Sequence, residues 1–146
     1  MAKRTLITCA LLYANGSLHL GHLVGYIQTD IYTRFLKLMG EDAVYVCADD
    51  THGAPIEINA QKQGLKPKEL IERMYGEHVK DFEEFKVAFD EYYSTHSDEN
   101  KEYSDRLFRI AKDKGYIYKQ DVDQLYCENC QRFLPDRYVK GKCPRC

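Results

Sequence analysis

No apolar run in this 146-residue sequence approaches the length of a membrane-spanning helix, and no signal-peptide core or cleavage site follows Met1. A strong charge of one sign is also missing. The net charge of −2 provides no overall basic field to attract nucleic acid, although a local patch or a further domain could still contact RNA. We therefore expect a cytoplasmic protein with no membrane partner. In that reducing compartment, the six cysteines are expected to be thiols or metal ligands rather than disulfides.

The first part of the chain predicts a strand, a long helix and a second strand. Thr5–Leu11 is a nearly continuous apolar run, which suits a strand buried on both faces. A helix is predicted over Gly21–Met39, ended by Gly40, and a second buried strand over Asp42–Ala48. The two strands should therefore be parallel. The apolar stripe predicted for the helix comprises Leu23, Val24, Ile27, Ile31, Phe35 and Leu38.

The Tyr13–His22 stretch lies between the first strand and the helix. A glycine-containing turn before a helix start forms an anion site, because free backbone N–H groups and the positive end of the helix dipole face the turn. His19 and His22 stand at that start, and Gly21 between them allows a flat ligand to approach the backbone. An ordinary turn with surface histidines is the alternative. The Asp49–Gly53 loop should leave the same edge of the sheet and face this stretch across a cleft.

Two further helices and a third strand follow. A short helix is predicted over Ala54–Gln63, and another starts at Lys66-Pro67. Residues Val87–Asp90 are a candidate third strand. The stripe of the second helix comprises Leu70, Ile71, Met74, His78, Phe82 and Phe85. We expect His78 to be a packed or partly exposed helix residue rather than a catalytic one.

The next helix is predicted over Glu99–Lys114, with Thr95 or Ser97 as its cap and Tyr103, Leu107, Ile110 and Ala111 facing inward. A domain boundary near residue 115 would divide the chain into residues 1–115 and 116–146. The second part contains two short β-like pieces, Tyr116–Lys119 and Asp123–Tyr126.

Four of the cysteines form two C-x-x-C pairs in this second part: Cys127, Cys130, Cys143 and Cys146. Two such turns can complete a tetrahedral zinc site, and four sulfur ligands leave no open position for catalysis, so a structural Zn²⁺ is expected. Redox dithiols or free surface thiols are the alternative. Cys9 and Cys47 lie in apolar strands and are expected to be core residues.

Four stretches together resemble the N-terminal part of methionyl-tRNA synthetases, a family of class I aminoacyl-tRNA synthetases. Ala14–His22 is similar to the HIGH signature of that class, and Cys47–Gly53, Tyr93–Asn100 and Phe133–Gly141 resemble three further family segments. The resemblance implies an α/β fold. It consists of the first half of a Rossmann-type parallel-sheet catalytic domain, followed by the start of a zinc-knuckle connective-peptide insertion.

The resemblance also implies a reaction, the ATP-dependent activation of methionine to methionyl-adenylate and transfer to tRNA(Met). In the full-length enzyme the partners would be methionine, ATP with Mg²⁺, and this tRNA. His19 and His22 would be catalytic and would stabilise charge on the phosphates. Asp50 would pair with the ammonium group of methionine, and His52 ranks below Asp50 as a residue of the substrate site. The nucleotide-binding residues would be Asn15, Gly16, His19, Gly21 and His22. The methionine-binding residues would be Leu11, Tyr13 and Asp50.

Two departures from the family pattern stand out. Leu12 occupies a position where the family commonly has proline, and the second signature, KMSKS, is missing together with the second half of the sheet. We expect the chain alone to be inactive or weakly active, with an exposed strand edge and a tendency to self-associate. The alternatives are a truncated, non-catalytic zinc-binding paralogue, another HIGH-bearing nucleotidyltransferase, and a zinc-stabilised interaction domain with incidental histidines.

Overall fold

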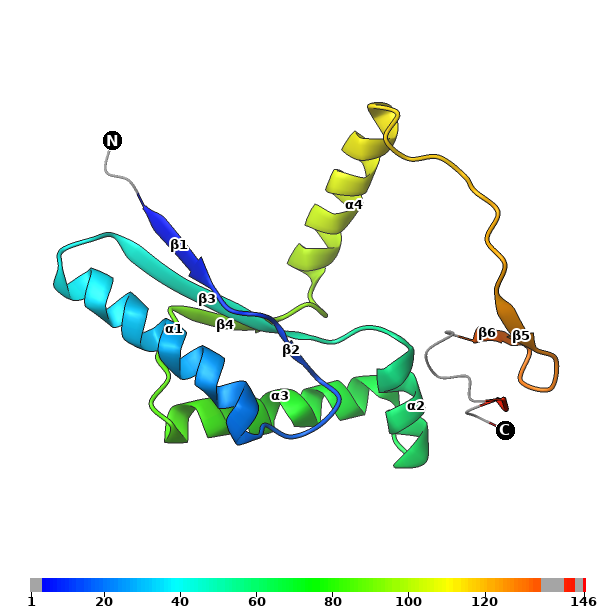
Figure 1. Ribbon diagram of the computed structural model, residues 1–146, viewed down its shortest axis with the longest axis horizontal. Coiled ribbons are helices and arrows are strands. Elements are labelled where there is room, and N and C mark those ends of the chain that lie inside the picture. The colour runs from blue at the N-terminus through cyan, green and yellow to red at the C-terminus, as the bar shows by residue number, and fades with distance from the viewer. Residues whose placement is uncertain (1–3, 135–140, 144–145) are drawn as a thin grey trace. The chain divides into compact units, whose positions relative to one another are not determined.

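The computed structural model describes residues 4–134, 141–143 and 146, so part of the Phe133–Gly141 stretch lies outside the described residues. The chain divides into two compact units, Met1–Glu102 and Tyr103–Cys146 (Figure 1). The functional division near residue 115 stays a prediction.

The first unit contains a parallel sheet centred on β3 (Ala43–Asp50) (Figure 1). On one side β3 pairs with β1 (Thr5–Thr8) and β2 (Leu12–Tyr13), and on the other with β4 (Glu91–Ser94). Thr5 pairs with Ala43 whereas Leu12 pairs with Asp49, so the register shifts by one residue between β1 and β2. The predicted first strand is therefore interrupted by a bulge and continues as far as Tyr13.

Two strand predictions need correction. The third strand is β4, which begins at Glu91 and not at Val87. The first strand is not buried on both faces, because the Leu6 side chain is 65% exposed while Ile7 faces the core. Within the first unit, helices pack on the face to which Ile7 points, and Leu6 on the opposite face keeps contact with solvent.

All four predicted helices are present: α1 (Leu20–Leu38), α2 (Ala54–Lys62), α3 (Pro67–Glu84) and α4 (Asp98–Asp113). Helices α1 and α3 pack on the same face of the sheet. Their shared core comprises Ile7, Leu12, Leu23, Tyr26, Ala43, Tyr45, Cys47, Phe82 and Val87. A second cluster joins α2 and α3 to the segment after β2 and comprises Ala14, Ile56, Ala60, Leu70, Ile71 and Met74.

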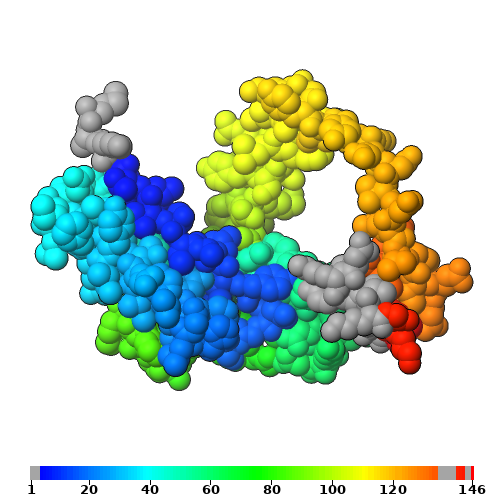
Figure 2. Space-filling model, viewed as in Figure 1, coloured from blue at the N-terminus to red at the C-terminus, as the bar shows by residue number. Residues whose placement is uncertain are grey.

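The stripe predicted for α1 is wrong for most of its positions. The helix buries Leu23, Tyr26, Asp30 and Thr33, and α1 is open to view along its length in Figure 2. Of the other predicted positions, Ile27 is partly buried and packs against the core, whereas Val24, Ile31, Phe35 and Leu38 are exposed. Burial of Asp30 is tolerated because its carboxylate accepts hydrogen bonds from Arg34 Nε (2.7 Å) and from the Ala88 backbone N–H (2.9 Å). Phe85, expected to face inward on α3, is also exposed.

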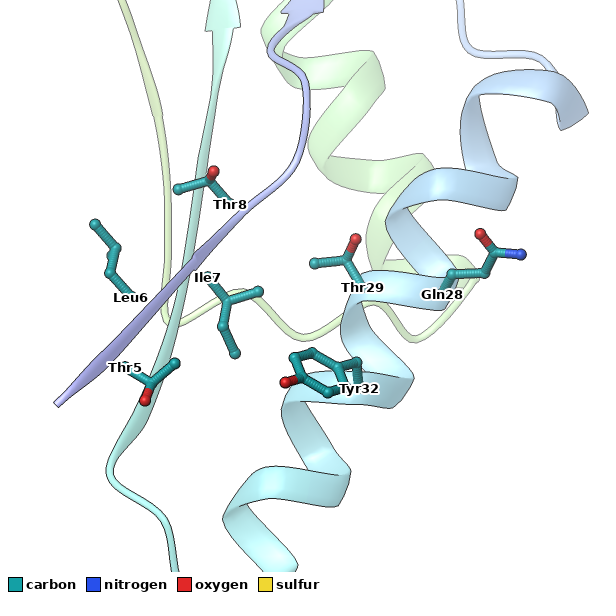
Figure 3. A pocket seen from close by; sticks show the side chains of 7 residues that line it. All are labelled: Thr5, Leu6, Ile7, Thr8, Gln28, Thr29 and Tyr32. Carbon is teal, nitrogen blue, oxygen red and sulfur yellow. The ribbon is translucent and has the colours of Figure 1, made fainter. Parts of the chain in front are cut away.

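An open hollow of about 530 Å³ lies between β1 and α1 (Figure 3). Thr5, Leu6, Ile7, Thr8, Gln28, Thr29 and Tyr32 line it. The lining carries no charged side chain and none of the residues expected to bind substrate, so this hollow is not the candidate site.

The second unit has little regular structure. An antiparallel hairpin pairs β5 (Leu125–Cys127) with β6 (Arg132–Leu134), whereas the strand expected at Tyr116–Lys119 is absent from this described segment. No residue of α4 is buried, so the inward positions expected on that helix are solvent-accessible in this chain. Ser97 caps the start of α4, as predicted, because its Oγ accepts the Asn100 backbone N–H at 3.2 Å. Among the described residues, no helix is both long and apolar enough to cross a membrane.

Candidate functional site

His19 and His22 form a stacked pair at the start of α1. His19 is the N-cap residue, and its Nδ1 accepts the His22 backbone N–H at 3.3 Å. The ring centroids are 3.5 Å apart, with 16° between the ring planes. Burial lowers the pKa of His22, and the neighbouring charges of His19 and His78 lower it further. A Cβ added at Gly21 would lie 3.2 Å from the His19 ring, so a side chain there would displace the pair.

The segment between β2 and α1, residues 14–19, is called the signature loop here. It leaves the same edge of the sheet as the loop that follows β3, as the sequence predicted, and the cleft expected between the two loops stays a prediction. Tyr13 pairs with Asp50 in the sheet, and the Ala14 backbone N–H donates to the Asp50 carbonyl at 2.9 Å. The Tyr13 hydroxyl donates to the His52 carbonyl at 3.0 Å. The Asp50 side chain is half-buried at this edge, and Leu11 is partly exposed in the bulge before β2.

A third loop, after β4, joins the same edge, and sequence reasoning did not include it in the site. The Thr95 backbone N–H donates to the Asp49 carbonyl (3.0 Å), and the Thr51 N–H donates to Thr95 Oγ1 (2.9 Å). His96 faces His52, with 3.4 Å between its Nδ1 and Nε2 of His52. If β4 had been predicted at its true position, this loop would have been a candidate part of the site, because it follows the carboxyl end of a parallel strand.

His78 on α3 is fully buried and contacts both the sheet and the signature loop. Its Nδ1 lies 2.9 Å from Asp49 Oδ1, and its Nε2 lies 2.9 Å from the carbonyl oxygen of Gly16. The Tyr92 hydroxyl donates to the same Asp49 oxygen. Burial lowers the pKa of His78, but the hydrogen bonds to Asp49 and Gly16 outweigh it, so the net shift is upward. The sequence predicted packing here but not these contacts.

Further hydrogen bonds hold the signature loop against α2 and α3. Asn59 Nδ2 donates to the Asn15 carbonyl at 2.7 Å, and Ser17 Oγ donates to Glu77 Oε2 at 3.1 Å. Asp49 Oδ2 is buried without a hydrogen-bond partner among the described residues, and so are two atoms at the signature loop, Asn15 Oδ1 and His22 Nδ1. Buried polar atoms are nearly always paired, so these two atoms are suited to meet a polar ligand.

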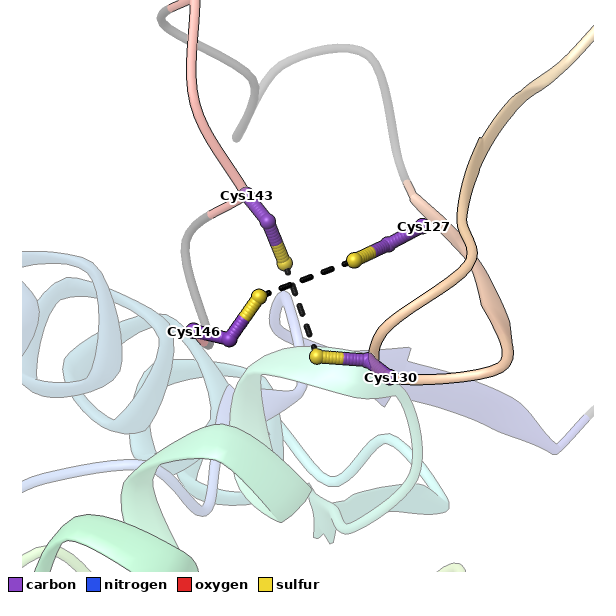
Figure 4. A group of neighbouring side chains, drawn as sticks. All are labelled: Cys127, Cys130, Cys143 and Cys146. Carbon is purple, nitrogen blue, oxygen red and sulfur yellow. Dashed lines mark hydrogen bonds between the residues drawn. The ribbon is translucent and has the colours of Figure 1, made fainter.

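The four predicted zinc ligands converge in the second unit (Figure 4). Sγ of Cys127 lies 3.6 Å from Sγ of Cys146, and Sγ of Cys130 lies 3.8 Å from Sγ of Cys143. All four sulfur atoms lie within 4.8 Å of one another. Four Zn–S bonds of ~2.3 Å in a tetrahedron give sulfur–sulfur edges of about 3.8 Å. The sulfur positions therefore fit one tetrahedral metal ion and are too far apart for disulfides. Cys47 is buried in the core of the first unit, as predicted, and Cys9 is partly buried and packs against that core.

Comparison with known proteins gives consistent similarities. The family described as "tRNA synthetases class I (M)" matches residues 5–146. A "Methionine--tRNA ligase" of Myxococcus xanthus is 58% identical over the whole chain, which covers 21% of that protein. One from Nitrosomonas europaea is 54% identical over 99% of the chain and 20% of its own length. The chain thus spans about a fifth of the length of the curated relatives it matches.

Solved structures show the same fold. Methionyl-tRNA synthetase of Mycobacterium tuberculosis, bound by methionyl-adenylate, superposes with a TM-score of 0.82 at 27% identity, over 95% of this chain and 28% of that one. A LeuRS-tRNA-LeuAMS complex from Agrobacterium radiobacter superposes with a TM-score of 0.80 at 22% identity. The superposition covers 94% of this chain and 18% of that one. A sequence identity of 22% supports a shared fold only.

Proposed function

Because the chain belongs to the methionyl-tRNA synthetase family of class I tRNA synthetases, we propose that its sheet edge forms the first half of a site that activates methionine with ATP. One observation carries this proposal. The stacked histidines begin the helix that follows β2, and Asp50 ends β3, the parallel strand that pairs with β2. This supports one site that combines an anion-binding helix start with a carboxylate partner for an ammonium group, because ligands bind at the carboxyl ends of parallel strands.

On the nucleotide side, the signature loop and the first turn of α1 bind the phosphates and adenine. The methionine carboxylate attacks the α-phosphate of ATP, and pyrophosphate leaves. His19 and His22, together with backbone N–H groups of the helix start, stabilise the charge that develops on the phosphate oxygens. Asn15, Gly16 and the open backbone at Gly21 complete this half of the site. Mg²⁺ accompanies ATP and is held largely by its phosphates.

On the methionine side, Asp50 pairs with the substrate ammonium, and Leu11 and Tyr13 line the side-chain pocket. Support comes from the Tyr13 hydroxyl, which is fixed on the His52 carbonyl beside Asp50. The relative from Mycobacterium tuberculosis holds methionyl-adenylate. Leu12, where the family commonly has proline, is buried in the core cluster and therefore anchors the strand by packing.

The remaining parts of the proposal concern the whole protein. The methionyl group passes from the adenylate to tRNA(Met), which places the protein in cytoplasmic protein synthesis. The cluster of Cys127, Cys130, Cys143 and Cys146 holds a structural Zn²⁺, and the insertion that it stabilises begins near residue 116.

The test is a chimera in which these 146 residues replace the matching segment of the Myxococcus xanthus relative. We expect methionine-dependent exchange of pyrophosphate into ATP, with no exchange in response to other amino acids. A chimera carrying His19→Ala and His22→Ala should lose at least about 100-fold in exchange rate, since each removes transition-state stabilisation. A folded chimera with no exchange, or exchange that survives both substitutions, would refute the proposal.

A further inference from the structure

The buried histidine on α3 is not used by the chemistry described above, yet it is the link between both substrate-binding loops. The His78 and Asp49 side chains are both inaccessible to solvent, and Asp49 is the residue before Asp50 at the end of β3. The Asp49 backbone carbonyl also accepts the Thr95 N–H of the third loop. The His78–Asp49 pair therefore contacts the signature loop, the end of β3 that bears Asp50, and the loop after β4.

Both ring nitrogens of His78 face oxygen atoms, and these contacts restrict the protonation states that the pair can adopt. The Gly16 carbonyl can only accept, so Nε2 must carry a proton to bond it. Asp49 Oδ1 already accepts the Tyr92 hydroxyl, and a carboxylate oxygen accepts from Nδ1–H as well. With Asp49 ionised, either neutral tautomer would point a nitrogen lone pair at an oxygen, and only the imidazolium satisfies both contacts. A neutral ring would need Asp49 to carry the proton and donate it to Nδ1. The raised pKa of His78 favours the ion pair.

The hydrogen bond to Gly16 also fixes the direction of the next N–H group. The C=O and N–H of a trans peptide point in opposite directions, and no peptide bond of the described chain is cis. With the Gly16 carbonyl held on α3, the Ser17 N–H points away from that helix. Asn59 holds the Asn15 carbonyl from α2 in the same manner and so orients the Gly16 N–H.

We propose that His78 is a positioning residue: as an imidazolium braced by Asp49 and Tyr92, it holds the signature loop so that its N–H groups are oriented for the phosphates of ATP. The inference rests on the proposed function, because the loop is taken to bind ATP. His78 does not touch substrate. It acts through Gly16, and through Asp49 it couples the nucleotide-binding loop to the strand that bears Asp50.

Two amide variants separate the two halves of this link. In His78→Gln the amide nitrogen can take the place of Nε2 and still donate to Gly16. In His78→Asn it can take the place of Nδ1, so the contact with Asp49 is kept and the one with Gly16 is lost. Phe82→Leu, one turn along the same face of α3, is the matched control, because it weakens the core and the packing on Tyr92 but leaves both hydrogen-bond partners of His78 in place.

The first readout is loop order in the 146-residue chain, measured as ¹⁵N order parameters of the Gly16 and Ser17 amides. We expect rigid values of about 0.85 in the wild type, His78→Gln and Phe82→Leu, and values below about 0.6 in His78→Asn. Equal order in the wild type and His78→Asn would overturn the proposal. Should His78→Asn fail to fold, Tyr92→Phe is the second variant, because it removes one hydrogen bond to Asp49. We expect it to lower the order parameters of the Gly16 and Ser17 amides partway. Unchanged order parameters in Tyr92→Phe would overturn the proposal.

The second readout is exchange kinetics in the chimera. His78→Asn should raise KM for ATP by roughly 10- to 100-fold, the loss expected for a hydrogen bond to a charged group, with KM for methionine changed less. His78→Gln should recover most of the loss. Equal effects of both amides would assign His78 a purely structural role. If the wild-type chimera shows no exchange, the proposed function fails, and the order parameters alone decide whether His78 holds the loop.

The third readout is pH dependence. Since the imidazolium is required, KM for ATP in the wild type should rise as pH increases through the raised pKa of His78, and His78→Gln should lack this component. The groups that face His78 or its Asp49 partner are Asp49, Tyr92, Tyr75, Glu77 and His22. All of them remain in both proteins, so the difference between the two pH profiles reports the titration of the coupled His78–Asp49 pair. Identical profiles would contradict the proposal.

Discussion

Removal of the metal should unfold the second unit and leave the first intact. Leu134 is the one buried apolar residue described in that unit, and burial of a leucine side chain contributes about 1.5–3 kcal/mol. Ordering the backbone of residues 125–134, 141–143 and 146 costs about 1–2 kcal/mol per residue, or on the order of 20 kcal/mol in total. A structural zinc ion supplies about 10–16 kcal/mol. Packing alone is therefore too weak, and we expect the folded knuckle to depend on a bound metal ion.

The assay is zinc analysis of the purified chain followed by ¹⁵N spectra during chelation. We expect one zinc per chain, and loss of the dispersed Leu125–Leu134 signals on chelation while the sheet signals stay unchanged. Cys130→Ser should weaken zinc binding strongly, whereas Cys9→Ser, outside the cluster, should not alter the zinc content. A hairpin that keeps its spectrum without metal would refute this reasoning, as would a chain that binds no zinc when folded.

Three further predictions concern the first unit. Gly53→Ala should destabilise the chain by about 1–2 kcal/mol in urea unfolding, because φ at Gly53 is +116° and the new Cβ would lie 3.0 Å from the Tyr13 hydroxyl; unchanged stability would contradict this. The hydrogen bond from Lys37 lowers the pKa of Asp90, so its contribution is present above the ordinary aspartate pKa of about 3.9 and is lost as pH falls below it. Asp90→Asn should therefore flatten the acid limb of the pH–stability curve, and an identical limb would count against the Lys37 pair. Ile31→Lys on the exposed apolar face of α1 should reduce self-association in sedimentation experiments, and a wild-type chain that is monomeric at all concentrations would show the face to be harmless.

The hydrophobic pattern predicted which elements form but not always which faces they bury. Periodicity and glycine punctuation were sufficient for the four helices and for the parallel pairing of β1 with β3. The buried face of α1 was missed because it includes Asp30 and Thr33. Thr33 donates to the Thr29 carbonyl, and Asp30 is paired as described above, so both can be buried although neither is apolar. Side-chain hydrogen bonds of this kind leave no mark in a hydrophobic pattern.

The candidate site was predictable where chemistry is local in sequence. The histidines at the start of α1, the loop after β3 and the C-x-x-C pairs can each be read from a short stretch. His78 and His96 could not be assigned in that way, because their partners are 62 and 44 residues away along the chain. Their roles follow from strand order and helix packing, which only the folded chain provides.

The central claim is that one edge of the sheet binds both ATP and methionine. The most direct measurement is a titration of the ¹⁵N-labelled chain with a non-hydrolysable methionyl-adenylate analogue, beside a His19→Ala, His22→Ala variant. We predict saturable shift changes concentrated in the signature loop, the first turn of α1 and Asp49–His52, and their loss in the variant. Shift changes centred elsewhere, or no shift changes in a folded wild-type chain, would contradict the account.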